Sequence, residues 1–376
     1  MDKPNSAMKQ IKFSLYVCAM SLISFLAHPA EHCGASWPLW EKFAQNHIAL
    51  DGRVIDYDAD DVSTSEGQSY ALFFSLVAGD KARFDLILKW INDNLAEGDL
   101  RGHLPAWKWG LHADGTWRVL DANRASDADL WIAYSLYQAA SIWKESSYHD
   151  TASAMLQNIS QQEVVALPQL GRMLLPAPYG FVLGSKVWRL NPSYLPVQLL
   201  RYFSTVDKLE AWDEIALNTL RMIASASNRG VVPDWVLFDD AKGFQFDLER
   251  GRYSGYDSIR VYLWWAMLSQ NDPLFEQLRP YVTGAAQFVP GRSSLPELID
   301  VSDGKESGQA PIGFAAALAP YRLVVYGHRQ KAPASLAEGA GYYNYVLSLF
   351  GYGWMEKRFL FNRDGSLQVN PRKCSK

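Results

Sequence analysis

Apolar positions along this chain recur mostly at helical spacing. Segments of roughly 10 to 20 residues carry apolar side chains at intervals of three and four, and strictly alternating apolar and polar runs are scarce. The pattern predicts an all-α protein. We expect helices at about 38–47, 65–78, 81–95, 126–144, 149–166, 193–204, 208–227, 257–269, 272–282, 310–326 and 340–350.

The predicted helices differ in how polar they are. Some carry a charged face, namely those that begin near residues 81, 208 and 272. Others are almost uncharged beyond their first turn, and these begin near residues 65, 126, 193, 257, 310 and 340. A helix that is apolar on all sides must be enclosed by other helices. Buried helices that alternate with more polar ones predict an (α/α)6 barrel, with six inner and six outer helices.

Long connections precede several of the predicted inner helices. They span residues 96–125, 167–192, 228–256 and 283–309. If the inner helices run parallel, their N-termini share one mouth of the barrel and the long connections gather there. Loops longer than about 12–15 residues in a compact domain are usually functional. No Gly/Ser-rich or Pro-rich linker interrupts residues 36–376, so we expect one catalytic domain with a short polar C-terminal tail.

The N-terminal segment has the pattern of a secretory signal peptide. Lysines precede an apolar run of about 15 residues from Phe13 to Ala27, and small residues follow at Cys33 and Ala35. The run is shorter than the ~20 residues of a membrane span, although an uncleaved anchor is an alternative. We expect residues 1–35 to be removed, leaving a periplasmic or secreted protein without a membrane span.

Composition narrows the ligand class. The formal net charge is −4 and no long basic run occurs, so nothing in the sequence attracts nucleic acid. The chain contains 14 Trp and 19 Tyr. These rings either build an aromatic core or line a cleft for a flat, polar ligand such as a sugar.

Acidic residues mark the starts of two predicted inner helices. In "SEGQSY", Ser65 and Gln68 have the spacing of a capping box, which places Glu66 in the first turn. In "ASDADLWIAYSL", Ser126 is the equivalent cap and Asp127 occupies the position of Glu66. Acids in a first turn also complement the helix dipole and need no further role. These acids, however, are followed at once by large apolar side chains in helices that we expect to be buried.

Two further helix starts add polar groups at the same mouth. In "YDSIRVYLW", Asp257 opens a helix and Arg260 follows one turn later, and "NPSY" places Tyr194 at the start of another. Paired carboxyls beside aromatic side chains suit cleavage of a glycosidic bond, for which one carboxyl is protonated and the other ionised. Motifs of zinc proteases, P-loop enzymes, dinucleotide-binding proteins and serine hydrolases are absent.

These four segments, in this order and spacing, resemble glycoside hydrolase family 8, over about residues 36–371. The resemblance implies an (α/α)6 barrel that hydrolyses β-1,4-glucan with inversion and needs no metal or other cofactor. It is nearest to the endo-1,4-β-glucanases encoded beside bacterial cellulose synthases. That implies glucan chains such as cellulose and cello-oligosaccharides as ligands, and a functional association with a cellulose synthase export complex.

The resemblance also implies roles for individual residues. Glu66 matches the proton donor, and Asp257 matches the residue assigned as base in most members. Asp127 matches a signature aspartate that is described either as a nucleophile or as the residue that holds the distorted sugar. Tyr194 and Arg260 match residues that position the water or orient the base. Sugar-stacking rings are expected among Trp107, Trp109, Trp117 and Trp188.

Other functions are also compatible with this sequence. The same acids would serve a xylanase, a chitosanase or a mixed-linkage glucanase (lichenase) of the family. A non-catalytic glucan-binding protein of cellulose export would keep the aromatic side chains but could lose an acid. A polysaccharide lyase would need cations against a uronate, and the motif segments are poor in them.

Overall fold

The computed structural model describes residues 36–207, 212–288, 295–337 and 339–369. The predicted signal peptide, residues 1–35, and the tail beyond residue 369 lie outside the described residues. No helix in the described ranges is both long and apolar enough to cross a bilayer.

The described residues form eleven α-helices, each where the apolar spacing predicts one. They are α1 (Pro38–His47), α2 (Ser65–Ala78), α3 (Lys81–Asn94), α4 (Ser126–Trp143), α5 (Ser146–Gln162), α6 (Val197–Val206), α7 (Trp212–Ala226), α8 (Ile259–Met267), α9 (Pro273–Val282), α10 (Ile312–Tyr326) and α11 (Tyr342–Met355). Short 3-10 segments, η1 (Pro192–Tyr194) and η2 (Thr283–Phe288), precede α6 and follow α9.

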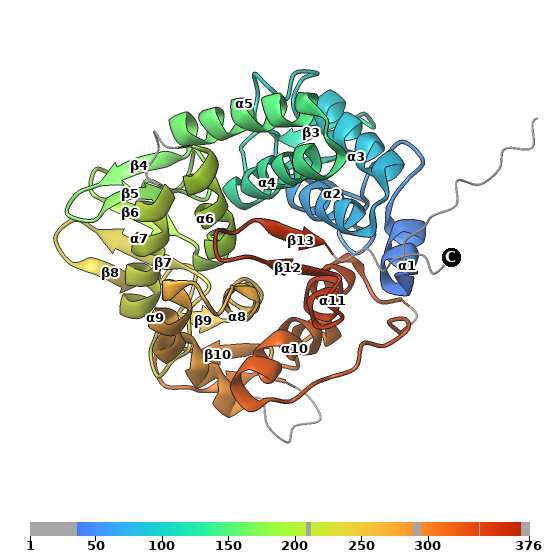
Figure 1. Ribbon diagram of the computed structural model, residues 1–376. Helices are drawn as coiled ribbons and strands as arrows, with labels where there is room; N and C mark the ends of the chain where they lie inside the picture. Colours follow the sequence, from blue (N-terminus) through green and yellow to red (C-terminus); the bar gives the residue numbers. More distant parts are fainter. Residues whose placement is uncertain (1–35, 208–211, 289–294, 338, 370–376) are drawn as a thin grey trace, which may run out of the picture. The chain divides into compact units, whose positions relative to one another are not determined.

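The helices form two concentric rings, which Figure 1 shows nearly end-on. The inner ring consists of α2, α4, α6, α8, α10 and α11, and every residue of α8 is buried. Helices α1, α3, α5, α7 and α9 lie outside and bury one face each, because only one face of each is apolar. The predicted (α/α)6 barrel is confirmed.

One outer position differs from the expected arrangement. The chain between α10 and α11, residues 327–341, contains no helix in its described part. It still covers the inner helices, since Gln330 Nε2 donates to the Tyr352 hydroxyl at 3.1 Å and Ala332 packs beside the same ring. Pro333 and a lack of helically spaced apolar residues explain why the described part of this segment forms no helix.

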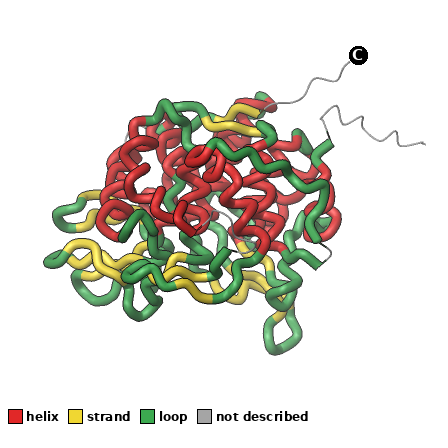
Figure 2. Tube along the Cα trace, turned by 90° about the horizontal axis from the view of Figure 1, so that it is seen from below, coloured by secondary structure: helices red, strands yellow, loops and turns green. Residues whose placement is uncertain are grey.

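The segments that connect the helices contain short strands, which the apolar pattern did not predict. Most of them lie on one side of the helices in Figure 2. All strand pairs are antiparallel. The strands are β1 (Ser63–Thr64), β2 (Lys108–Leu111), β3 (Trp117–Asp121), β4 (Val164–Leu167), β5 (Gly171–Leu174), β6 (Val187–Leu190), β7 (Val236–Asp239), β8 (Gly243–Phe246), β9 (Tyr253–Ser254), β10 (Leu298–Asp300), β11 (Glu306–Ser307), β12 (Phe359–Phe361) and β13 (Leu367–Val369).

The β12–β13 hairpin closes the end of the barrel away from the long connections, and it crosses the middle of the ring in Figure 1. The Tyr134 hydroxyl donates to the Gly365 carbonyl at 2.7 Å, and the Leu367 N–H donates to Gln138 Oε1 at 3.0 Å. Tyr134 lies at the middle of α4 and Gln138 in its second half. The helix N-termini therefore face the other end, where the long connections lie.

Aromatic side chains fill the core. Phe73 and Trp131 meet at a ring distance of 4.9 Å, and Phe350 contacts both. Seven of the 14 tryptophans are buried, whereas the rest are half-buried or exposed. The aromatic content thus serves the core and also leaves rings near the surface.

Candidate active site

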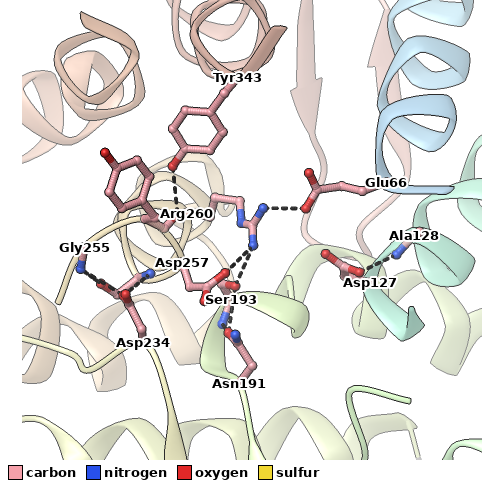
Figure 3. Close-up of polar contacts among 12 residues, drawn as sticks. Glu66, Asp127, Ala128, Asn191, Ser193, Asp234, Gly255, Asp257, Arg260 and Tyr343 are labelled. Carbon is pink, nitrogen blue, oxygen red and sulfur yellow. Dashed lines mark hydrogen bonds and ion pairs between the residues drawn. The ribbon is translucent and has the colours of Figure 1, made fainter. Parts of the chain in front are cut away.

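A single guanidinium joins groups from three of the inner-helix starts. Arg260 Nη1 donates to Glu66 Oε2 at 2.6 Å, and Nη2 donates to Asp257 Oδ1 at 2.9 Å and to Ser193 Oγ at 3.1 Å (Figure 3). The arginine side chain is 6% exposed, while those of Glu66 and Asp257 are each 27% exposed. Two carboxyls thus reach solvent on either side of a buried cation.

The start of α2 places Glu66. Thr64, not the predicted Ser65, caps the helix, because its Oγ1 accepts a hydrogen bond from the Gly67 N–H at 3.0 Å. Gln68 does not complete a capping box, since its side chain binds backbone groups of the preceding loop. The predicted result still holds: Glu66 lies in the first turn at the mouth of the barrel.

Asp127 lies in the first turn of α4, but it is only 2% exposed. Its Oδ1 accepts a hydrogen bond from the Ala128 N–H at 2.8 Å, and its Oδ2 has no partner among the described residues (Figure 3). Burial, followed by the charge of Glu66, raises the pKa of Asp127 to about 7, although Arg260 opposes the shift. This carboxyl is therefore partly protonated near neutral pH.

Asp257 lies in a tight turn just before α8, and the turn is held by Asp234. Asp234 Oδ1 accepts hydrogen bonds from the N–H groups of Gly255 and Ser258, both at 2.8 Å (Figure 3). Burial and the charge of Asp257 raise the pKa of Asp234 to about 6. Sequence reasoning did not single out Asp234, which lies outside the four motif segments.

Tyrosines surround the three acids. Tyr194, on η1, is half-buried, and desolvation of its hydroxyl together with the charges of Asp127 and Asp257 raises the pKa of that hydroxyl well above the usual range. It therefore remains a hydrogen-bond donor at neutral pH. The motif segments bring Tyr194 to the acids, as expected.

Three more tyrosines have hydroxyl groups that are affected by the charges of the acids. Burial and the charge of Glu66 raise the hydroxyl pKa values of Tyr70, Tyr342 and Tyr343. Tyr343 donates to the Tyr256 carbonyl at 2.7 Å (Figure 3). A sequence signal for them existed: Tyr70 lies within the "SEGQSY" motif, and the other two open α11, a predicted inner helix.

Among the predicted stacking residues, Trp107 contacts the start of α2, which carries Glu66, through its backbone. Its carbonyl accepts a hydrogen bond from the N–H of Ser65, next to Glu66, at 3.0 Å. Its side chain hydrogen-bonds to Asp121, which lowers the pKa of that carboxyl. The indole is half-buried.

The other predicted rings lie differently. Trp109 and Trp117 stack on each other at 5.2 Å, and the guanidinium of Arg53 lies 4.5 Å from each ring centre. Trp117 is 45% exposed. Trp188, on β6, is half-buried against Phe238 at 6.1 Å, and no contact joins it to the acids among the described residues.

A second pair of carboxyls lies behind Asp127. Asp129, one turn into α4, and Glu163, at the end of α5, are fully buried and within hydrogen-bonding reach of each other. No donor of the described residues contacts any of their oxygens. Burial raises both pKa values well above the usual range, so the folded protein favours a proton on this pair.

The arrangement suits acid–base chemistry. Arg260 contacts one oxygen of Glu66 and one of Asp257, and no donor among the described residues contacts the second oxygen of either. Each carboxyl can therefore keep its hydrogen bond to Arg260 and use the other oxygen to give or take a proton. The described residues contain no group of three or more His, Cys, Asp or Glu side chains that could hold a metal ion.

Comparison with known proteins finds relatives along nearly the whole chain. The sequence pattern described as "Glycosyl hydrolases family 8" matches residues 12–357. The chain is 42% identical over 346 residues to an endoglucanase of Escherichia coli O157:H7, covering 91% of this chain and 93% of that protein. It is 44% identical over 361 residues to an endoglucanase of Xanthomonas axonopodis pv. citri (strain 306), covering 93% of each.

A solved structure shows the same likeness in three dimensions. The endo-1,4-D-glucanase from Vibrio fischeri ES114 superposes with a TM-score of 0.82 at 38% identity, over 89% of this chain and 99% of that one. The family pattern covers residues 12–357, which include every helix start that contributes to the site, and the two relatives cover 91% and 93% of this chain. The chain therefore belongs to family 8 of the glycosyl hydrolases.

Proposed function

We propose that this protein is an endo-1,4-β-glucanase that hydrolyses cellulose and related glucan chains with inversion of the anomeric carbon. The observation that carries the proposal is the pair of solvent-reaching carboxyls, Glu66 and Asp257, on one buried guanidinium. Relatives that are 42–44% identical are endoglucanases, which supports β-1,4-glucan as the substrate.

In the proposed reaction, Glu66 donates its proton to the glycosidic oxygen that leaves. Asp257 takes a proton from a water molecule whose oxygen attacks the anomeric carbon from the opposite face. The C–O bond to the leaving sugar breaks as the new C–O bond forms, so the protons balance between the two carboxyls. Arg260 stays between them and offsets negative charge as Asp257 gains a proton and Glu66 loses one.

The burial of Asp127 supports a binding role instead of a nucleophilic one. A nucleophile must be ionised and must touch the anomeric carbon, whereas Asp127 is 2% exposed with a pKa raised to about 7. In our proposal it binds a sugar hydroxyl and helps to hold the distorted ring. Tyr194, whose hydroxyl keeps its proton, positions the attacking water.

The substrate is tested by measuring reducing-sugar release from carboxymethylcellulose, xylan, chitosan and mixed-linkage glucan side by side. We expect the fastest hydrolysis with carboxymethylcellulose and a loss of that activity in Glu66→Gln. A preference for xylan, chitosan or mixed-linkage glucan would assign the chain to another activity. Glucan binding without hydrolysis would indicate the non-catalytic alternative.

We also propose that the protein is exported to the periplasm or beyond after removal of residues 1–35, and that it acts together with a cellulose synthase export complex. The basic, apolar and small-residue order of the N-terminal segment supports export. N-terminal sequencing of exported protein should find Ser36 or a near neighbour first. An intact Met1, or activity confined to membranes, would contradict the cleavage.

A further inference from the structure

Asp234 lies outside the proposed acid–base pair but is built into the turn that carries Asp257. It precedes β7 by two residues, and its own N–H donates to the Tyr253 carbonyl at 2.7 Å. Its Oδ1 accepts the N–H groups of Gly255 and Ser258, at 2.8 Å each. One side chain thus ties the two residues that flank Tyr256 and Asp257.

A chain of buried hydroxyls fixes the same turn from the side of α8. The Val232 N–H donates to the Tyr262 hydroxyl at 2.9 Å, and that hydroxyl lies 3.1 Å from Ser254 Oγ. Ser254 Oγ lies 2.8 Å from Ser258 Oγ, which is hydrogen-bonded to Asp234. If each of these hydroxyls donates to the next group in the direction of Asp234, every donor in this series of hydrogen bonds has an acceptor. The series then ends at the Asp234 carboxylate.

The turn has little freedom to change shape. A Cβ at Gly255 would lie 2.6 Å from Leu298 Cδ2 and 3.4 Å from Asp234 Oδ2, so the backbone is closely packed there. Asp257 follows two residues later, with its Oδ1 on Arg260 at 2.9 Å. The direction of the Asp257 carboxyl therefore depends on the hydrogen bonds that hold residues 255–258.

We propose that Asp234 is a positioning residue of the hydrolysis: it holds the 255–258 turn so that Asp257 keeps one oxygen on Arg260 and presents the other to the attacking water. This inference rests on the proposed function, in which Asp257 is the base. A displacement of about 1 Å at a reacting group costs up to ~10²-fold in rate, so the effect should be large.

The charge of Asp234 adds to its geometric role. Asp257 is the charged group that acts on it, and the neutral hydroxyls of Ser258, Tyr262 and Tyr343 face it from α8 and α11. The ionised form of Asp234, which predominates above pH of about 6, is the stronger acceptor for the two N–H groups that hold the turn.

The test compares Asp234→Ala and Asp234→Asn with wild type on carboxymethylcellulose. Asp234→Ala removes both hydrogen bonds and should lower kcat by ~10²-fold with KM changed less than about threefold. Asp234→Asn keeps an acceptor oxygen but loses the charge, so kcat should fall by ~10-fold. The acidic limb of its kcat profile should lose the titration near pH 6. Asp239→Ala is the matched control, because Asp239 Oδ1 also accepts two backbone N–H groups, in the β7–β8 turn.

Equal kcat values for wild type and Asp234→Ala would overturn the inference, as would an unchanged pH profile in Asp234→Asn or an equal loss in Asp239→Ala. If Asp234→Ala does not fold, the asparagine variant still decides the question. Failure of the proposed function is separate, because wild type itself would then release no sugar from any β-1,4-glucan.

Discussion

The buried pair Asp129 and Glu163 should make the stability of the protein depend on pH in an unusual direction. An acid whose pKa is raised in the folded state is bound to its proton more tightly there than in the unfolded chain. Its contribution is fully present below the unfolded pKa, which is near 4 for these groups, and is lost as the pH rises toward the folded pKa. Wild type should therefore lose stability between pH 6 and pH 8.

The size of the effect follows from the proton count. Both carboxyls are ionised in the unfolded chain above pH of about 6, whereas burial without a described donor favours a proton on the folded pair. For each proton that the folded pair retains, the free energy of unfolding falls by about 1.4 kcal/mol per pH unit as the pH rises. One retained proton therefore lowers it by about 3 kcal/mol over two pH units.

The double variant Asp129→Asn/Glu163→Gln should remove this dependence. Two amides of the same shape can form an N–H···O bond and bind no proton. We would measure urea unfolding by tryptophan fluorescence at pH 6, 7 and 8 at constant ionic strength. The free energy of wild type should fall by about 1.4 kcal/mol per pH unit relative to the variant. Asp150→Asn, at an exposed site on α5, is the control. Parallel pH dependences for wild type and the double variant would refute the retained proton.

The remaining predictions concern the reaction. Glu66→Gln should lower hydrolysis by ~10²–10⁴-fold with an unchanged melting temperature, and near-normal reducing-sugar release would remove Glu66 from the mechanism. Proton NMR in the first minutes of hydrolysis should show the α-anomer, with Asp257→Ala nearly inactive and Asp127→Asn impaired; an initial β-anomer would make Asp127 the nucleophile. Trp107→Ala should weaken cello-oligosaccharide binding in calorimetry more than Trp109→Ala does, because the ring of Trp109 already stacks on another indole. Equal losses would contradict that difference.

The helices could be predicted because a helix that is buried on all sides has a recognisable sequence, a long run of apolar residues with almost no charge. The buried faces of α2, α4 and α8 contain almost no charge, so apolar spacing located them. The strands have no comparable sequence pattern. They are two to five residues long and gain their order from pairing across loops, as β2 does with β1 and β3.

The site was predictable where it depends on helix starts and unpredictable where it depends on distant contacts. Glu66, Asp127 and Asp257 could be found because each lies at or next to the start of an inner helix. That Arg260 also holds Glu66, 194 residues away, could not be inferred from local pattern. Asp234 was missed for a similar reason, because its role depends on the backbone of a loop that it meets only after folding.

The β12–β13 hairpin has a consequence for how the chain is made. Its side chains cover the inner ring: Phe359 lies 5.2 Å from Phe73 and Phe361 lies 6.1 Å from Tyr134. The hairpin lies far behind these helices along the chain, with Gly365 231 residues after Tyr134, so α2 and α4 wait for their covering until the hairpin has been synthesised. A nascent chain that stops before residue 359 keeps an uncovered aromatic surface for chaperones to bind. Removal of the hairpin should therefore impair folding. A tag attached after residue 369 leaves the hairpin, and so this covering of the inner helices, intact.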